Sequence, residues 1–341
     1  MQTKRPDGRV TLRDIAGITG YTMNTVSRAL KNKPDIARDT CLKIQKAARE
    51  AGYIRNWIAG SLRTGRSDTI AVIVCDLSNP FFALMVGDIE AAAGTYQYTV
   101  IVLCTHENQE KEDVALQVAI GRQVDGVLLC PCQESDKSLR VLQEANIPFV
   151  LLSRHFADQT ANAMVCDEEK GGYLAAEHLI THGHRKLVYL SSFGHVSGIA
   201  ERKKGFLAAA RQYGIPQEDC LVYHHDDGPK TAAFLREKHK EGFTGVFAYC
   251  DMEAWKVITH LQQLGIRVPQ DLAFTGYDNI QGRLGFPFPL CSVESSLKEL
   301  CHSSVKLLNQ KIMGDKSLPG KVVFPVELVC RGSCQAGWAP R

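Results

Sequence analysis

From residue 69 onward, short apolar runs of β character alternate with amphipathic helical segments, and this alternation limits the folds open to the chain. The runs form two series of four: TIAVIVCDL (69–77), YTVIVLC (98–104), VDGVLLCP (124–131) and PFVLLS (148–153), then KLVYLSS (186–192), LVYHH (221–225), GVFAYCD (245–251) and LAFTGYD (272–278). Apolar strands separated by helices are typical of parallel sheets covered on both faces. The two series predict two similar lobes, at about 70–160 and 161–290, with final strands returning near 291–330. Ligands bind such sheets at the carboxyl ends of their strands, and a cleft between two lobes would gather several of these ends.

The N-terminal stretch 9–31, RVTLRDIAGITGYTMNTVSRALK, has the pattern of two short helices joined by a tight turn. Thr11 and Asp14 form a capping-box pattern at the start of the first helix. Gly20 ends this helix, and Thr22 is placed to cap a second one. The second helix presents an outward polar and basic set formed by Met23, Asn24, Thr25, Ser27 and Arg28. Such a face is typical of the helix that a helix-turn-helix places in the DNA major groove, although a small helical bundle is the alternative.

Positive charge is concentrated at this end of the chain. Residues 1–66 contain 14 Lys and Arg against 5 Asp and Glu, a net charge of +9, whereas the remainder carries a net charge of −6. A basic head on a mildly acidic body favours binding of a polyanion through the head alone. A third helix is predicted over 38–51, with Ile44 and Ala47 among its inward residues.

Residues 53–68, YIRNWIAGSLRTGRSD, are predicted to form a linker with one or two helical turns. So short a helix is marginal in water, and Gly60 weakens it by about 1 kcal/mol relative to Ala. We therefore expect a head at 1–54, a hinge helix and linker at 55–68, and a body at 69–341.

The 12 cysteines do not form a disulfide pattern, because many of them end or follow apolar runs where Cys acts as a small buried hydrophobe. Cys130 and Cys132 are spaced C-x-C with no second pair nearby, so we expect no metal site there, and no cofactor. The sequence has no signal peptide and no apolar run near 18 residues. A cytoplasmic, reduced protein that does not associate with membranes is expected.

An enzyme is disfavoured, because no G-x-G-x-x-G follows the first body strand, no P-loop occurs and no nucleophile–base arrangement is recognisable. A solute-binding protein for sugar transport would share the body. It would leave the basic head unexplained and would need an export signal.

In order along the chain, these segments resemble the LacI family of bacterial transcription regulators. The similarity is carried by VTLRDIAGITGYTMNTVSRAL, NWIAGSLRTGRS, DLSNPFF, VDGVLL, DEEKGGYLAAEHLITHGHRKLVYL, KGFLAAA, GYDN and FPVELV. The resemblance implies an α/β fold class: a helix-turn-helix head followed by two doubly wound parallel-sheet lobes of periplasmic-binding-protein type. It implies a sequence-specific regulator, a repressor in most of the family, that binds double-stranded DNA at a near-palindromic operator as a homodimer and responds to a small, sugar-like effector. The tail RGSCQAGWAPR has no heptad pattern, so nothing suggests a tetramer.

The resemblance also assigns DNA-binding residues. It places Met23, Asn24 and Arg28 on base edges, and Thr22, Thr25 and Ser27 on phosphates. In the family the hinge helix inserts a Leu into the minor groove, here Leu62, with Asn56 and Ala59 on the same side. Arg55 and Gly60 depart from the family pattern, and Leu62 packing the linker against the body is the alternative.

For the cleft, the resemblance assigns effector-binding residues on both lobes: Asn79, Phe81, Phe82, Ser153, Arg154, Arg202, Cys250 and Asp278. Three alternatives stay open: Phe81 and Phe82 as core residues, Asp278 as a helix cap, and Arg202 as a solvated charge. The chain departs from the usual sugar-binding pattern at Ser153, which replaces Asp, at Cys250, which replaces Asn, and at Gly228, which replaces an aromatic residue. The effector could accordingly be a modified or phosphorylated sugar, another metabolite, or a protein in its place.

Overall fold

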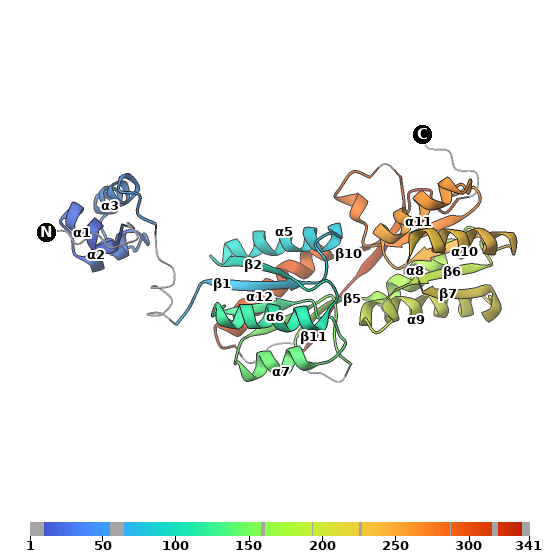
Figure 1. Ribbon diagram of the computed structural model, residues 1–341, viewed down its shortest axis with the longest axis horizontal. Coiled ribbons are helices and arrows are strands. Elements are labelled where there is room, and N and C mark those ends of the chain that lie inside the picture. Colours follow the sequence, from blue (N-terminus) through green and yellow to red (C-terminus); the bar gives the residue numbers. More distant parts are fainter. Residues whose placement is uncertain are drawn as a thin grey trace. The chain divides into compact units, whose positions relative to one another are not determined.

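The computed structural model describes residues 10–54, 65–157, 161–192, 194–224, 227–286, 288–315 and 320–335 (Figure 1). The chain divides into two compact units, Met1–Ser67 and Asp68–Arg341. This division falls within two residues of the expected start of the body at residue 69.

The described part of the head contains three helices: α1 (Leu12–Thr19), α2 (Met23–Ala29) and α3 (Arg38–Glu50). The predicted capping box is present, because the Thr11 amide donates to Asp14 Oδ2 at 2.7 Å and the Asp14 amide donates to Thr11 Oγ1 at 3.4 Å. Gly20 ends α1 in the left-handed conformation at φ +75°, where a side chain would be strained. Thr22 Oγ1 accepts from the Thr25 amide at 3.2 Å and caps α2.

The three helices bury a small apolar core made of Ile15, Val26, Ala29, Cys41, Ile44 and Ala48. The prediction for the inward face of the third helix was partly wrong. Ala48 and Cys41 are buried there, whereas Ala47 is half-buried. The spacing 41, 44 and 48 follows one helical face, and Ala47 lies at its edge.

The first lobe of the body has a six-stranded, all-parallel sheet in the order β11-β5-β4-β3-β1-β2. Its strands are β1 (Thr69–Val74), β2 (Thr99–Cys104), β3 (Gly126–Leu129), β4 (Phe149–Leu152), β5 (Ala163–Cys166) and β11 (Lys321–Phe324). Helices α5 (Pro80–Thr95) and α12 (Leu297–Ile312) cover one face, and α6 (Gln109–Gly121) and α7 (Lys137–Glu144) cover the other.

The second lobe repeats this arrangement in the order β12-β10-β9-β8-β6-β7, with only β12 antiparallel to its neighbour. Its strands are β6 (Leu187–Ser191), β7 (Cys220–His224), β8 (Gly245–Ala248), β9 (Ala273–Tyr277), β10 (Cys291–Ser295) and β12 (Val326–Val329). Helices α8 (Glu168–Thr181) and α9 (Ser197–Gln212) cover one face, and α10 (Gly228–Lys240) and α11 (Asp251–Gln263) cover the other. Short 3₁₀ turns lie at Gln217–Asp219 and Ile280–Gly282.

The chain crosses between the lobes three times, after β5, after β10 and between β11 and β12. The expected start of the second lobe at residue 161 was therefore too early, because β5 belongs to the first sheet. The final strands return as expected near 291–330, but they divide between the sheets, with β11 in the first and β12 in the second. Three connections therefore link the two lobes.

Candidate functional site

A cavity of about 480 Å³ lies between the two lobes. It is formed where strands of both sheets reach their carboxyl ends, as the alternation of strands and helices predicts for such folds. All eight residues assigned to the cleft from the sequence line it: Asn79, Phe81, Phe82, Ser153, Arg154, Arg202, Cys250 and Asp278. Sequence reasoning missed several other lining residues, among them Asp76, Glu107, Tyr249, Glu253 and Lys256.

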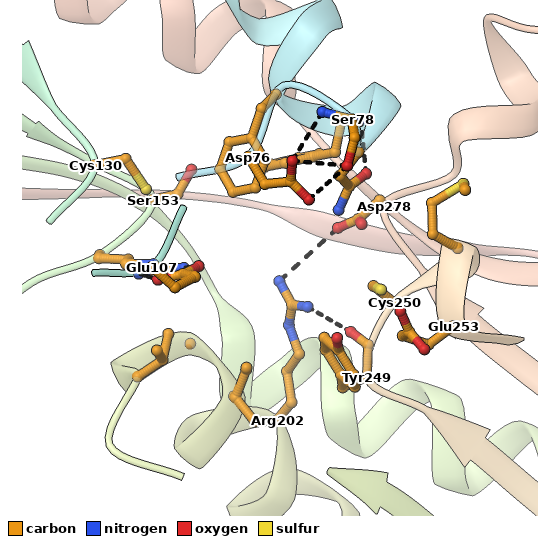
Figure 2. Close-up of a pocket in the computed structure, with 18 of the residues that line it drawn as sticks. Asp76, Ser78, Glu107, Cys130, Ser153, Arg202, Tyr249, Cys250, Glu253 and Asp278 are labelled. Carbon is orange, nitrogen blue, oxygen red and sulfur yellow. Dashed lines mark hydrogen bonds and ion pairs between the residues drawn. The ribbon is translucent and has the colours of Figure 1, made fainter. Parts of the chain in front are cut away.

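Arg202 enters the centre of the cavity from α9 (Figure 2). Its Nε donates to Glu168 Oε2 at 2.6 Å, its Nη1 donates to the Tyr249 carbonyl at 2.6 Å, and its Nη2 lies 4.0 Å from Asp278 Oδ1. The guanidinium also lies 3.5 Å from the centre of the Tyr277 ring. Its side chain is only 12% exposed, so the solvated-charge alternative is wrong.

Close packing of α8 against α9 holds the Arg202–Glu168 pair. A Cβ added at Gly172 would lie 2.0 Å from the Arg202 carbonyl oxygen, and one added at Gly205 would lie 1.9 Å from the Glu169 carbonyl oxygen. Only glycine permits this backbone approach. The short separation of the two helices therefore fixes where Arg202 emerges.

Asp278 lies in the loop after β9 at φ +100°, which is strained for a residue other than glycine. Burial raises the pKa of its carboxyl group well above the ordinary value, and the Arg202 guanidinium opposes this shift. The helix-cap alternative is wrong, because the 3₁₀ turn that follows has Asn279 as its N-cap and no side-chain cap hydrogen bond. The carboxylate instead faces Arg202 across the cavity (Figure 2).

Asp251 supports this loop from beneath, and sequence reasoning did not assign it a role. Its Oδ2 accepts from the Ile280 amide at 3.0 Å and its Oδ1 accepts from Ser292 Oγ at 2.6 Å. Burial raises the pKa of Asp251 to about 7. The loop that carries Asp278 therefore rests on a buried group that titrates near neutral pH.

On the first lobe, Arg154 follows β4 and is almost completely buried. Its Nη1 donates to Glu107 Oε2 and to the Pro131 carbonyl, each at 2.8 Å, and its Nη2 donates to Glu107 Oε1 at 2.5 Å. Burial acts to lower the pKa of Arg154, but the paired Glu107 carboxylate is among the groups that hold that pKa above the ordinary value.

Asn79 caps α5, because its Oδ1 accepts from the Phe81 amide at 3.0 Å. The cap uses the carbonyl oxygen of the side chain and leaves the amide group at the cavity wall. The Phe81 and Phe82 rings make an edge contact with centroids 5.3 Å apart. Phe82 belongs to the buried core of the first lobe and Phe81 packs against it, so both rings combine a core role with a place on the cavity wall.

The three departures from the family pattern have different structural outcomes. Ser153 lines the cavity in the left-handed conformation at φ +57°. Cys250 is buried at the start of α11, and burial raises the pKa of its thiol well above the ordinary value. Gly228 does not line the cavity among the described residues, and a Cβ there would lie 2.8 Å from the His260 ring. An aromatic side chain at 228 would therefore require His260 to move.

An ion pair and a histidine–carboxylate contact join the lobes outside the cavity. Arg283 of the second lobe binds Asp88 of α5 through two hydrogen bonds, at 2.5 and 2.9 Å. His155 of the first lobe lies 2.8 Å from Glu201 of α9. These contacts hold the lobes at their present angle.

In the head, the face of α2 assigned to DNA is accessible. Thr22, Met23, Asn24 and Arg28 are exposed, whereas Thr25 and Ser27 are half-buried. Arg28 is not free: its Nε donates to Asp35 Oδ2 at 2.8 Å and its Nη2 lies 2.6 Å from Asp35 Oδ1. The hinge residues Asn56, Ala59 and Leu62 lie outside the described residues.

The described part of the head has three helices with a helix-turn-helix arrangement, and the body has two doubly wound lobes around a cavity. A family model described as "Bacterial regulatory proteins, lacI family" matches residues 11–56, and one described as "Periplasmic binding protein-like domain" matches residues 176–334. The chain belongs to the LacI family of bacterial transcription regulators. Within the described part of the chain, every helix is too short or too polar to cross a lipid bilayer.

Similar proteins extend over almost the whole chain. The HTH-type transcriptional regulator DegA of Bacillus subtilis is 29% identical over 333 residues, which cover 95% of this chain and 98% of DegA. The HTH-type transcriptional repressor CytR of Escherichia coli is 28% identical over 343 aligned positions, which cover 98% of this chain and 99% of CytR. The lac repressor dimer bound to operator and the anti-inducer ONPF shares the fold at 23% identity, with a TM-score of 0.82 over 96% of this chain and 100% of that one.

Proposed function

We propose that this regulator binds a small, neutral, hydroxyl-rich molecule of sugar type between its lobes, and that the ligand controls how tightly a homodimer holds a near-palindromic operator. The observation that carries the proposal is the pairing of charges in the cavity. Among the described lining residues, each Arg and Lys has a carboxylate partner: Arg154 with Glu107, Arg202 with Glu168 and Asp278, and Lys256 with Glu253.

This pairing favours a neutral ligand over a phosphorylated one. The described lining contains four carboxylates, Asp76, Glu107, Glu253 and Asp278, against the three cations, so a phosphate would meet as much negative as positive charge. Paired carboxylates and guanidinium groups still have lone pairs and N–H bonds for ligand hydroxyls.

The remaining lining suits a sugar ring. Phe81 and Phe82 supply apolar faces for C–H groups, and the Asn79 amide supplies a fixed donor beside them. A LacI family regulator from Enterococcus faecium with bound ribose supports this proposal, at 26% identity and a TM-score of 0.71 over 79% of this chain and 99% of that one.

For DNA, the proposal assigns base contacts to Met23, Asn24 and Arg28, and phosphate contacts to Thr22, Thr25 and Ser27. The Arg28–Asp35 pair is solvent-exposed, and water screens such pairs strongly, so guanine can displace Asp35 at little cost. Asn56, Ala59 and Leu62 are proposed to form the minor-groove hinge.

The test is a thermal-shift and calorimetry panel of neutral sugars against sugar phosphates, with two matched variants. Asn79→Ser keeps the α5 cap, because Ser caps as well as Asn, but removes the amide at the cavity. Asn108→Ser changes the equivalent cap of α6, where Asn108 Oδ1 accepts a hydrogen bond of 2.9 Å from the Lys111 amide. Asn108 is not among the residues that line the cavity.

A neutral sugar should bind, and Asn79→Ser should weaken it about three- to tenfold, the value of one neutral hydrogen bond. Asn108→Ser should leave the affinity unchanged. Preferential binding of the phosphates, or equal affinity in both variants, would overturn the proposed ligand class or its site.

A further inference from the structure

A cluster of metal-binding side chains lies in the second lobe, far along the strands from the cleft. It consists of His178 in the last turn of α8, Cys291 at the amino end of β10, and Cys330 and Cys334 in the segment that follows β12. The cleft lies at the opposite, carboxyl ends of the strands parallel to β10. The regulatory function described above uses none of these residues.

The four candidate ligand atoms, one imidazole nitrogen and three sulfurs, all lie within 4.8 Å of one another. The sulfur–sulfur distances are 3.4 Å for Cys291–Cys334, 3.7 Å for Cys291–Cys330 and 3.9 Å for Cys330–Cys334. His178 Nε2 lies 2.8 Å from Cys334 Sγ.

These distances fit a tetrahedral ion better than a disulfide. Zinc–sulfur bonds of about 2.3 Å place tetrahedral sulfurs about 3.8 Å apart, close to the three observed separations, whereas bonded sulfurs lie about 2.05 Å apart. In a zinc tetrahedron the nitrogen and sulfur ligands lie roughly 3.6 Å apart. The His178 Nε2 to Cys334 Sγ distance of 2.8 Å is shorter than this by less than about 1 Å. Three thiolates and one imidazole form a common ligand set of structural zinc sites.

The surroundings of the sulfurs are already organised. The Arg331 amide donates to Cys291 Sγ at 3.1 Å, the kind of outer contact that orients a metal-bound thiolate. Ser333 is buried; its Oγ accepts from the Cys291 amide and donates to the Phe274 carbonyl, each at 2.7 Å. The segment carrying Cys330 and Cys334 is thus held against β9 and β10.

We propose that His178, Cys291, Cys330 and Cys334 bind one Zn²⁺ ion that fastens the segment after β12 to α8 and β10. The ion links three parts of the chain that are far apart in sequence, so its role is structural. Three cysteines and one histidine fill a tetrahedron and leave no open position for substrate.

The segment that carries Cys330 and Cys334 also contacts the loop that carries Asp278. Arg331, between two of the ligands, donates through Nη2 to Asn279 Oδ1 at 2.5 Å and through Nη1 to the Leu290 carbonyl at 3.0 Å. Asn279 directly follows Asp278. Loss of the ion should therefore loosen the segment that carries Arg331.

The test measures zinc in the full chain after desalting and follows Co²⁺ substitution by absorption. About one zinc per chain is expected, together with a thiolate-to-cobalt charge-transfer band and the strong visible bands of tetrahedral cobalt. Cys291→Ser should abolish stoichiometric binding. Cys330→Ser, which changes an exposed ligand and should still fold, should reduce the charge-transfer band by about a third.

The matched control is Cys220→Ser, which changes a buried cysteine of the same lobe outside the cluster. It should keep both the zinc and the cobalt spectrum. The proposal is wrong if wild-type protein binds neither metal stoichiometrically, or if Cys330→Ser and Cys220→Ser give the same spectrum. It is also wrong if peptide mapping of unreduced protein finds a disulfide between any two of Cys291, Cys330 and Cys334.

Discussion

The two lobes of the body have the same architecture and each directs one buried arginine to the cleft, yet the two arginines differ in what they bind. Arg154 of the first lobe donates its hydrogen bonds within that lobe, to both carboxylate oxygens of Glu107 and to the Pro131 carbonyl. Arg202 of the second lobe shares its donors between Glu168 and a carbonyl, and its Nη2 remains 4.0 Å from Asp278 (Figure 2). The comparison indicates that Arg154 holds its lobe together, whereas Arg202 and Asp278 are available to a ligand.

The largest expected effect is on stability and belongs to the first lobe. Arg154→Ala removes a buried guanidinium and leaves the half-buried Glu107 carboxylate without its partner, and this should cost about 3 kcal/mol in the free energy of unfolding. Chemical denaturation measures it. The control Arg140→Ala removes an exposed i,i+4 pair with Asp136 and should cost less than about 1 kcal/mol. Equal losses of unfolding free energy in the two variants would contradict the structural role assigned to Arg154.

The next prediction compares one cavity carboxylate from each lobe, Asp278 of the second lobe and Glu107 of the first. Asp278→Asn keeps the shape of the side chain but weakens an acceptor that faces the cavity, so ligand affinity should fall about 10- to 100-fold with little change in stability. Glu107→Gln, on the first lobe, should lower stability more than affinity. Calorimetry and denaturation on both variants measure the split. The comparison between the lobes fails if the two variants behave alike.

The head extends the comparison to a third arginine, Arg28, which is exposed and bound to Asp35. Arg28→Ala should leave folding unchanged and relax base preference at one position of each half-site by about 1–3 kcal/mol. Selection from randomised DNA measures this loss. The exposed Arg49 provides the control, because Arg49→Ala should not alter the selected sequence. Unchanged selectivity in Arg28→Ala would contradict its assignment to a base.

The last effect is a pH dependence that originates in the second lobe. Because the pKa of Asp251 is raised to about 7 in the folded chain, the folded state binds more protons than the unfolded state between about pH 4 and 7. Stability should therefore fall as pH rises through this window, by at most about 1.4 kcal/mol per pH unit. Denaturation across the window should show a shallower dependence in Asp251→Asn. Identical slopes would show that another group carries the dependence.

Much of the fold follows from local sequence. The capping box at Thr11 and the strand–helix alternation depend on residues a few positions apart, and both appear in the structure. All eight cleft residues assigned from the resemblance line one cavity, because strand ends of both sheets meet there. Their role in binding remains a proposal.

What the sequence did not reveal depends on contacts between distant residues. Glu107 lies 47 positions from Arg154 in a loop at φ +53°, and nothing in its local sequence marks it as a partner. The placement of β5 in the first sheet depends on its pairing with β4 and with β11, which comes from near the other end of the chain. The cluster around Cys291 draws ligands from three separate segments, so spacing alone did not identify it.

The central claim is that a ligand in the cleft controls occupancy of the operator. The most direct measurement titrates operator affinity with a neutral sugar from the panel, using an operator selected in vitro, for wild type and Asp278→Asn. The account predicts that wild type and Asp278→Asn bind the operator equally well without ligand. The variant should need a sugar concentration about 10- to 100-fold higher to produce the same change in operator affinity. An identical sugar dependence in both proteins would contradict it.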